Sequence, residues 1–131
     1  MWESFFSQSV IYGLDINPRC LSLATDRAKV YIGDQTDVTL LNSIVQDAGG
    51  SFDLIIDDGG HEMIQHQTSL ETLFQYLNPG GIYVIEDLHT AYEKNYGGGL
   101  HHTNSTMEYL KNLTDGINQG SSGVELRPEL R

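Results

Sequence analysis

Acidic residues stand directly after four short apolar segments of this sequence, where carboxylates from separate segments could together bind a cation. Carboxylates that crowd together raise one another's pKa unless a positive charge neutralises them, and a hard divalent cation with oxygen ligands supplies that charge. A single acid in such a place is more simply explained as a helix N-cap or a solvated loop residue. Because acids follow all four apolar segments, we favour a shared cation over separate caps or loop residues. The acids are Asp15, Asp34, Asp57, Asp58, Glu86 and Asp87.

The metal set that the spacing favours is Asp58 with Glu86 and Asp87, because the two segments that carry them are expected to be neighbouring strands. An all-carboxylate set suits Mg²⁺ or Mn²⁺, with waters or substrate hydroxyls completing the octahedron. Side chains alternate across a strand, so Asp57 and Asp58 are not expected to face the same side. One of the two is therefore expected to serve a different ligand.

His61 follows Asp58 by three residues, just past Gly59–Gly60. Its neutral imidazole would be a suitable general base near pH 7, because acidic neighbours stabilise the imidazolium that the reaction forms. A capping or packing role for this histidine is an equal alternative. His61 and His89 also keep Zn²⁺ as a lesser alternative, and His89, His101 and His102 are candidates to line a substrate lid.

The elements that position these residues alternate between β-type and helical segments. Such an alternation predicts parallel strands with right-handed crossovers. The fold class is therefore α/β, with a Rossmann-like, doubly wound parallel sheet whose carboxyl edge binds ligands. Strands are predicted at 10–15, 30–34, 52–58 and 82–85, and helices at 38–48 and 63–77.

The two ends of the sequence fit this pattern less well. Residues 1–6 are typical of the end of a longer helix, and 103–113 could form another helix. The glycines at 97–99 predict a flexible loop, because a phosphate-binding loop needs a strand running directly into it. We expect residues 1–118 to form a partial α/β domain and 119–131 to be a flexible polar tail.

Composition limits the partners of this 131-residue chain. Eighteen acidic against seven basic residues give a net charge of −11, which repels nucleic acid and anionic membranes. The single cysteine, Cys20, cannot form an internal disulfide. Because the sequence shows neither an apolar run of about 20 residues nor a secretory leader, we expect a cytoplasmic protein.

The residues at the ends of two predicted strands suggest a binding site for a nucleoside. An acid at Asp15 could accept hydrogen bonds from both ribose hydroxyls, as acids do in nucleotide-binding folds. The sequence Gly33-Asp34-Gln35 places a carboxylate or an amide where an adenine amino group could donate. Together they indicate an adenosine-containing cofactor.

Four segments resemble class I S-adenosylmethionine-dependent methyltransferases. They are IYGLDINP (11–18), GDQ (33–35), DDGGH (57–61) and PGGIYVIED (79–87). Within that class, the sequence from 12 to 99 is similar to metal-dependent sugar O-methyltransferases of the mycinamicin VI 2''-O-methyltransferase type, and cephalosporin-hydroxylase-named proteins share much of the pattern. The pairing of DDGGH with the later Glu-Asp is the more specific part of the resemblance.

The resemblance implies an S-adenosylmethionine- and Mg²⁺-dependent enzyme that methylates a hydroxyl of a sugar or polyol. Mn²⁺ is an alternative metal. His61 would be the catalytic base, and Asp58, Glu86 and Asp87 would bind the metal. The implied cofactor-binding residues are Asp15, Gly33, Asp34, Gln35 and Asp57.

One departure from the family concerns the glycine-rich cofactor loop, which should follow a first strand upstream of Asp15. Only nine residues precede Val10, whereas a βαβ unit needs about 30 residues. We therefore expect an incomplete sheet that lacks its first and final strands, with exposed edges that promote homo-oligomers. The alternative function is a catalytically inactive metal-binding or assembly module, and a metal-dependent hydrolase is a third reading without motif support.

Overall fold

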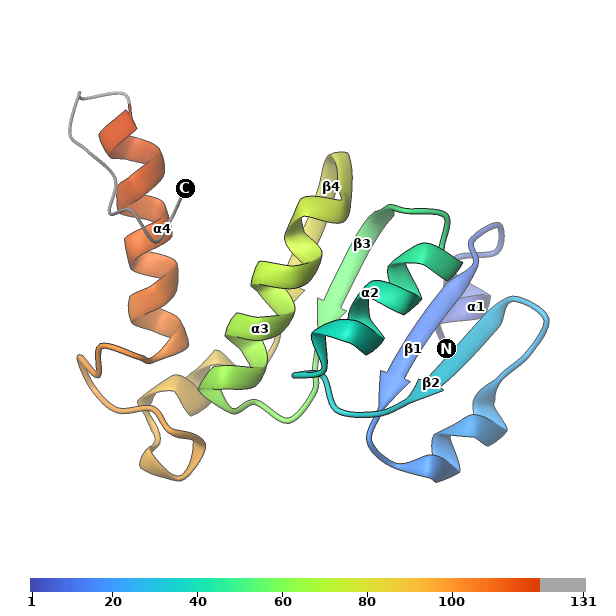
Figure 1. Cartoon of the computed structure of the whole chain (residues 1–131), viewed down its shortest axis with the longest axis horizontal. Coiled ribbons are helices and arrows are strands. Elements are labelled where there is room, and N and C mark those ends of the chain that lie inside the picture. Colours follow the sequence, from blue (N-terminus) through green and yellow to red (C-terminus); the bar gives the residue numbers. More distant parts are fainter. Residues whose placement is uncertain (121–131) are drawn as a thin grey trace.

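The computed structural model describes residues 1–120, and its four strands are all parallel to their hydrogen-bonded neighbours (Figure 1). Strand β1 pairs with β2 and β3 pairs with β4, and within residues 1–120 no backbone ladder joins the two pairs. The predicted α/β class is confirmed, and the sheet takes the form of two strand pairs side by side. The strands are β1 (Ile11–Asp15), β2 (Ala28–Ile32), β3 (Phe52–Asp57) and β4 (Leu77–Ile85).

Strand β4 begins five residues earlier than its apolar core predicts, because it contains an irregularity. Phe52 pairs with Leu77 and Leu54 pairs with Ile82, so two steps along β3 correspond to five along β4. The three extra residues bulge out around Gly80, which has φ +85°. A positive φ favours glycine, so the sequence Pro79-Gly80-Gly81 interrupts the strand without ending it.

Helix α2 (Val38–Asp47) is confirmed at the predicted place and its cap is Asp37. The Asp37 carboxylate accepts hydrogen bonds from the backbone N–H groups of Thr39 and Leu40, which satisfies two of the donors left free at a helix start. Gly49 and Gly50 follow the helix with positive φ angles. The buried face of α2 consists of Leu41, Ile44 and Val45.

Helix α3 (Met63–Leu73) starts with a reciprocal capping box between Glu62 and Gln65 and ends earlier than predicted. A 3₁₀ turn, η2 (Phe74–Tyr76), takes over and leads directly into β4. The buried face of α3 is more polar than that of α2, because it holds His66, Ser69 and Thr72 beside Met63 and Leu70.

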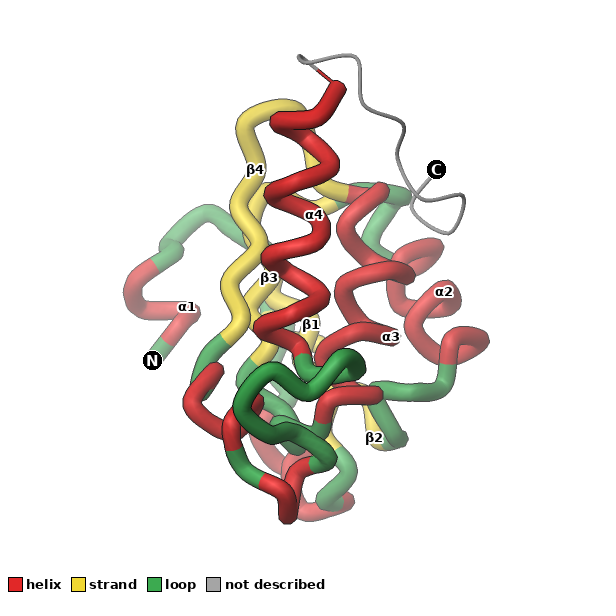
Figure 2. The backbone as a smooth tube through the Cα atoms, turned by 90° about the vertical axis from the view of Figure 1, so that its left-hand side faces the viewer, coloured by secondary structure: helices red, strands yellow, loops and turns green. Residues whose placement is uncertain are grey.

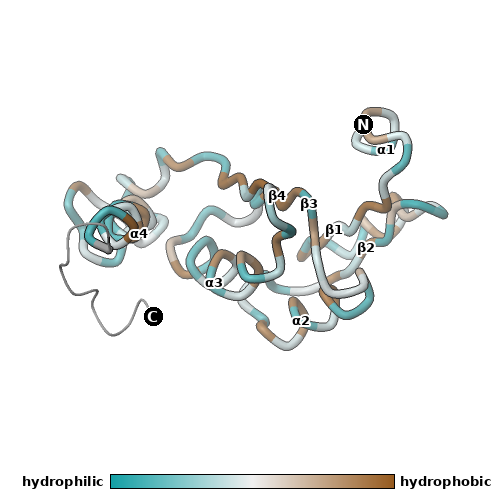
Figure 3. Tube along the Cα trace, turned by 90° about the horizontal axis from the view of Figure 1, so that it is seen from above, coloured by the Kyte–Doolittle hydropathy of each residue, from teal (hydrophilic) through white to brown (hydrophobic). Residues whose placement is uncertain are grey.

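Helices α2 and α3 lie on one side of the strands, and the short helix α1 (Trp2–Phe5) lies on the other (Figure 3). Arg27 anchors α1, because its guanidinium donates to the backbone carbonyls of Glu3, Phe6 and Ser9. A 3₁₀ helix that the sequence analysis missed, η1 (Pro18–Leu23), is capped by the Asn17 side chain.

The segment after β4 forms the turns η3 (Leu88–Tyr92) and η4 (Lys94–Tyr96), a glycine loop at 97–99, and helix α4 (Thr106–Gly120). Helix α4 contacts α3 and η3, beside the loops that gather at one end of the molecule (Figure 2). The tail expected at 119–131 begins inside α4, and its remainder, 121–131, lies outside the described residues. Among the helices of residues 1–120, none has the length and apolar content for a bilayer crossing.

Side chains rather than a backbone ladder connect the two strand pairs. At their amino ends the rings of Tyr12 and Phe52 meet edge to face, with centroids 6.1 Å apart. Near their carboxyl ends the Gln35 amide nitrogen donates to Asp57 Oδ1 at 3.0 Å and to Ser69 Oγ at 3.1 Å. The Gln35 carbonyl oxygen accepts from the backbone N–H of Gly60 at 2.9 Å. One side chain after β2 therefore links β3, α3 and the loop that follows β3.

Replacing Gln35 tests this link. We expect Gln35→Ala to lower the free energy of unfolding by about 2 kcal/mol, because buried Asp57 and Ser69 both lose the amide that donates to them. Gln35→Glu should cost at least as much, since a carboxylate would then face Asp57 in place of an amide donor. Urea-induced unfolding measures both changes.

Gln75→Ala is the matched control, because the exposed Gln75 side chain donates only to the Thr72 carbonyl of the preceding turn. Its effect on the free energy of unfolding should stay within about 0.5 kcal/mol. A Gln35→Glu variant as stable as the original chain would show that the amide does not hold the two strand pairs together.

His66 is fully buried on α3, with 0% of its surface exposed. Its Nδ1 lies 3.3 Å from the Thr106 hydroxyl of α4, and its Nε2 has no hydrogen-bond partner among the described residues. Burial lowers the pKa of His66, an effect that nearby Asp57 opposes and His61 reinforces. The folded protein therefore holds this ring neutral to a lower pH than the unfolded chain does.

This lowered pKa makes stability depend on pH. An unfolded histidine titrates near pH 6.5. Below about pH 6.5 the unfolded chain therefore binds a proton at this residue while folded His66 stays neutral, and the free energy of unfolding falls. Above that pH His66 contributes no slope. We expect His66→Gln to flatten the decline below about pH 6.5, measured by urea unfolding at each pH. Equal slopes in both proteins would contradict a neutral buried His66.

Candidate metal and cofactor site

Three side chains from two loops meet at the carboxyl end of β3 and β4. His61 Nε2 lies 4.0 Å from Asp58 Oδ1 and 3.7 Å from Asp87 Oδ2. The three potential ligand atoms all lie within 4.8 Å of one another. This set, Asp58, His61 and Asp87, is called the carboxylate–histidine cluster below.

Pairing of β3 with β4 brings the two loops together. Asp57 is opposite Ile85, and the N–H of Glu86 donates to the Asp57 carbonyl at 2.9 Å, so the ladder runs to the start of both loops. His61 and Asp87 then adopt left-handed backbone conformations, with φ of 60° and 50°. Such conformations cost non-glycine residues about 1–3 kcal/mol each and concentrate at functional sites.

The donor set of the cluster fits a divalent cation. The two carboxylates suit Mg²⁺ or Mn²⁺, whereas a site that also used the imidazole as a ligand would suit Zn²⁺. The carboxylates are more than half exposed, which leaves room for the waters that Mg²⁺ retains. His61 is the more enclosed member, with 20% of its side chain exposed and Nδ1 buried without a partner among residues 1–120. The ring therefore presents only Nε2 to the cluster.

The structure places the other two acids of this edge differently. Glu86 is exposed and does not belong to the cluster that the structure brings together. Asp57 is buried, with 7% of its surface exposed, and faces α3. The alternation expected for Asp57 and Asp58 is thus present, because one carboxylate points into the protein and the other to solvent.

The acids after β1 and β2 are both exposed and both accept backbone hydrogen bonds. Asp15 Oδ1 accepts from the N–H of Asn17, and this bond, with a weaker contribution from Cys20, lowers the Asp15 pKa. Asp34 Oδ1 accepts from the N–H and the hydroxyl of Thr36, which lowers its pKa in the same way. Both residues are therefore carboxylates at neutral pH and can accept hydrogen bonds from a ligand.

The remaining cofactor-site candidates, Gly33 and Gln35, lie in the turn after β2. A side chain at Gly33 would collide with Leu40 of α2, so this glycine permits close packing of the turn. A side chain at Gly59 would collide with Gln35, which lets the loop after β3 approach the amide closely. The Gln35 side chain itself is engaged in the bonds to Asp57, Ser69 and Gly60.

Sequence reasoning missed the buried polar groups beneath the cluster. Tyr83 lies beside Asp57, and burial is the main reason why its pKa is raised, followed by the Asp57 charge. The alternation of side chains along β4 could have indicated Tyr83, because Tyr83 lies on the same face of β4 as Ile85, which is opposite Asp57. Nothing in the sequence pattern indicated Ser69.

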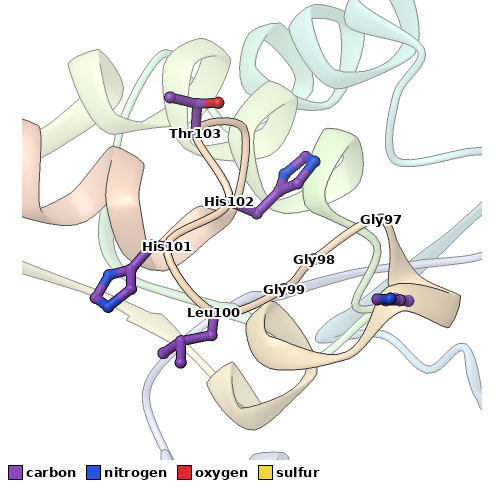
Figure 4. A pocket seen from close by; sticks show the side chains of 8 residues that line it. Gly97, Gly98, Gly99, Leu100, His101, His102 and Thr103 are labelled. Atoms are coloured by element: carbon purple, nitrogen blue, oxygen red, sulfur yellow. The ribbon is translucent and has the colours of Figure 1, made fainter.

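Two hollows lie along the segments that follow the cluster residues, and neither is lined by Asp58, His61 or Asp87. The first, about 740 Å³, is formed by the glycine loop and residues to Thr103, and its His101 and His102 side chains point in opposite directions (Figure 4). The second, about 410 Å³, includes Glu62 and Met63, which directly follow His61. His102 lines both. The lid role expected for these histidines stays a prediction.

Known proteins resemble this chain over most of its length. The family described as "Methyltransferase domain" matches residues 1–128. Mycinamicin VI 2''-O-methyltransferase of Micromonospora griseorubida is 40% identical over an alignment of 120 residues, and the match covers 89% of this chain and 30% of that protein. The 8-demethyl-8-alpha-L-rhamnosyl tetracenomycin-C 2'-O-methyltransferase of Streptomyces olivaceus is 37% identical over an alignment of 118 residues, and the match covers 89% of this chain and 31% of that protein.

Solved structures give the same result. The methyltransferase MycE in complex with Mg, SAH and mycinamycin VI matches with a TM-score of 0.82 and 39% identity, over 88% of this chain and 30% of that one. A second crystal form, with Mg and SAH, matches with a TM-score of 0.84 and 37% identity over 97% of this chain and 32% of that one. The chain thus spans about 30% of the length of these relatives, and by sequence and structure it belongs to the methyltransferase-domain family.

Proposed function

We propose that this chain supplies the metal site and part of the cofactor site of an S-adenosylmethionine- and Mg²⁺-dependent O-methyltransferase that acts on a sugar hydroxyl. The relatives are named as O-methyltransferases, and one solved relative holds Mg, SAH and mycinamycin VI. The carboxylate–histidine cluster is the single observation that carries the proposal, because it brings cation ligands and a candidate base within 4.8 Å.

Asp58 and Asp87 would hold the metal, and the resemblance adds Glu86 as a third carboxylate. When bound, Mg²⁺ supplies Lewis-acid polarisation that lowers the pKa of a coordinated hydroxyl. The exposed carboxylates leave solvent-facing positions for neighbouring hydroxyls of a sugar ring. A glycoside or polyol acceptor therefore suits this set better than an isolated alcohol does, because two hydroxyls can be oriented at once.

His61 would act as the general base. The acceptor oxygen forms a bond to the methyl carbon, the carbon–sulfur bond of the sulfonium breaks with its electron pair returning to sulfur, and the hydroxyl proton passes to His61 Nε2. Asp58 and Asp87 lie within 4.0 Å of that nitrogen, so the proposed base stands directly beside the residues that would hold the metal. Its buried Nδ1 leaves Nε2 as the nitrogen that receives the proton.

The cofactor would lie along the carboxyl edge of β1 and β2. Asp15 would accept from the ribose hydroxyls, and Asp34 would lie near the adenine amino group, with Gly33 allowing the turn to pack closely. Both carboxylates are ionised and exposed, as hydrogen-bond acceptors for a nucleoside need to be. Gln35 and Asp57 are the other two expected cofactor residues. In the structure the Gln35 amide donates a hydrogen bond to Asp57.

A second candidate function is a metal-binding or assembly module without catalysis. The observation that favours it is the separation of β1–β2 from β3–β4, which leaves unpaired strand edges in the described part of the chain. Exposed strand edges promote pairing with another chain. A homo-oligomer formed through these edges therefore accompanies this alternative.

Calorimetric titration of the 131-residue chain with S-adenosylmethionine tests the proposal. We expect saturable binding that Mg²⁺ strengthens, because the metal neutralises carboxylates on the same edge of the fold. Asp87→Asn should abolish the Mg²⁺ effect while leaving binding without Mg²⁺ unchanged. Glu86→Gln determines whether Glu86 joins the metal site, since its side chain lies outside the cluster in the structure.

Asp53→Asn is the matched control, because Asp53 is an exposed acid on β3 that bonds Asn78 away from the cluster. It should keep the full Mg²⁺ effect. Absence of heat with and without Mg²⁺ would favour the assembly module over the methyltransferase.

Replacing His61 tests its role as base. We expect His61→Ala to lower the rate of methyl transfer about 10²–10⁴-fold, with S-adenosylmethionine binding unchanged. Transfer of a radiolabelled methyl group from S-adenosylmethionine to 8-demethyl-8-alpha-L-rhamnosyl tetracenomycin-C or mycinamicin VI measures the rate. An unaltered rate would assign the imidazole to packing.

A further inference from the structure

We infer that Thr90 is a positioning residue for the proposed metal site: its hydroxyl ties the loop after β3 to the loop after β4 and holds the cluster together. Thr90 lies in η3 and is 2% exposed. Its Oγ1 is 3.1 Å from the carbonyl oxygen of His61 and 3.0 Å from that of Asp87. The inference rests on the proposed function, because it assigns this hydroxyl a task for the metal site.

The two carbonyls do not depend equally on the hydroxyl. A threonine hydroxyl carries one proton, and the Asp87 carbonyl already accepts the Thr90 backbone N–H at 3.0 Å. The hydroxyl proton is therefore available for the His61 carbonyl, 29 residues away in the sequence. This bond connects the Thr90 side chain, in η3, to the backbone of the loop after β3.

The Thr90 hydroxyl contacts two residues with strained backbone conformations. His61 and Asp87 are two of the three non-glycine residues with positive φ in the described part of the chain. The contacts around such residues must hold the conformation, and Thr90 contacts both. Without a bound cation the carboxylates of Asp58 and Asp87 also repel each other, so the two loops need a link that does not involve the metal.

Thr90 is itself fixed in place. The next residue, Ala91, is 0% exposed, and its carbonyl accepts the N–H of Gly99 at 2.9 Å. Gly98 donates to the Glu93 carbonyl at 3.0 Å, and a side chain at Gly98 would collide with the backbone of Ala91. The glycine loop thus braces η3, and the Thr90 hydroxyl is held against a rigid support.

The hydroxyl can be removed with little change in volume. We expect Thr90→Val to weaken the affinity of the 131-residue chain for Mn²⁺ about tenfold or more, the effect of losing a contact that orients metal ligands. Thr90→Ser keeps the hydroxyl and should restore the affinity. Electron paramagnetic resonance of free Mn²⁺ measures it, at a temperature where every variant is folded.

Thr72→Val is the matched control, because Thr72 is a buried threonine of α3 away from the cluster. It should leave the Mn²⁺ affinity unchanged, even if it lowers the melting temperature. A Thr90→Val variant that melts earlier but binds Mn²⁺ as the original chain does would reduce Thr90 to a structural residue and overturn the inference.

A second measurement needs no metal. The ¹³Cα and ¹³Cβ shifts of His61 and Asp87 report their left-handed conformations, and we expect Thr90→Val, but not Thr90→Ser, to shift them toward values for negative φ. Unchanged shifts in Thr90→Val would overturn the inference while leaving the proposed function intact. Failure of the unsubstituted chain to bind Mn²⁺ would instead refute the proposed metal site, and with it the task assigned to Thr90.

Discussion

The Gln35 amide is the contact on which the arrangement of this edge depends. The backbone holds β1 to β2 and β3 to β4, but only side chains connect the two pairs in the described residues. Gln35 satisfies both its donor and its acceptor groups across that boundary, on Asp57, Ser69 and Gly60. Near the carboxyl edge, Gln35 therefore helps to set the distance between the acids of β1–β2 and the carboxylate–histidine cluster.

The cluster combines features that oppose folding with features that compensate for them. Two carboxylates close together and two left-handed backbones all cost free energy. The ladder between Asp57 and Glu86 and the contacts of Thr90 hold the two loops in position despite these costs. Such preorganisation suits a metal site, because a cation then relieves repulsion without having to bring the ligands together.

Sequence periodicity predicted the alternation of strands and helices, the position of α2, and the convergence of acids at one edge, because each depends on local pattern and on the parallel topology. It did not predict the separation into strand pairs, which depends on contacts between distant segments. The bulge in β4 was missed because Pro79-Gly80-Gly81 also fits a turn. The sequence predicted Asp58, Asp87 and His61 at one edge, but it did not show that Glu86 lies outside their cluster, since a side chain's direction depends on loop conformation.

The family resemblance and the structure assign different roles to Gln35. The resemblance puts its side chain near adenine, but an amide offers two donor hydrogens and one carbonyl, and all three are in use within the protein. Contact with adenine through these atoms would release Gly60 and Asp57, and so loosen the loop that carries His61. Adenine recognition by the exposed Asp34 carboxylate requires no such loss, because Asp34 uses only Oδ1 in its bonds to Thr36. Cofactor and metal residues can then act together, with Gln35 as the support between them.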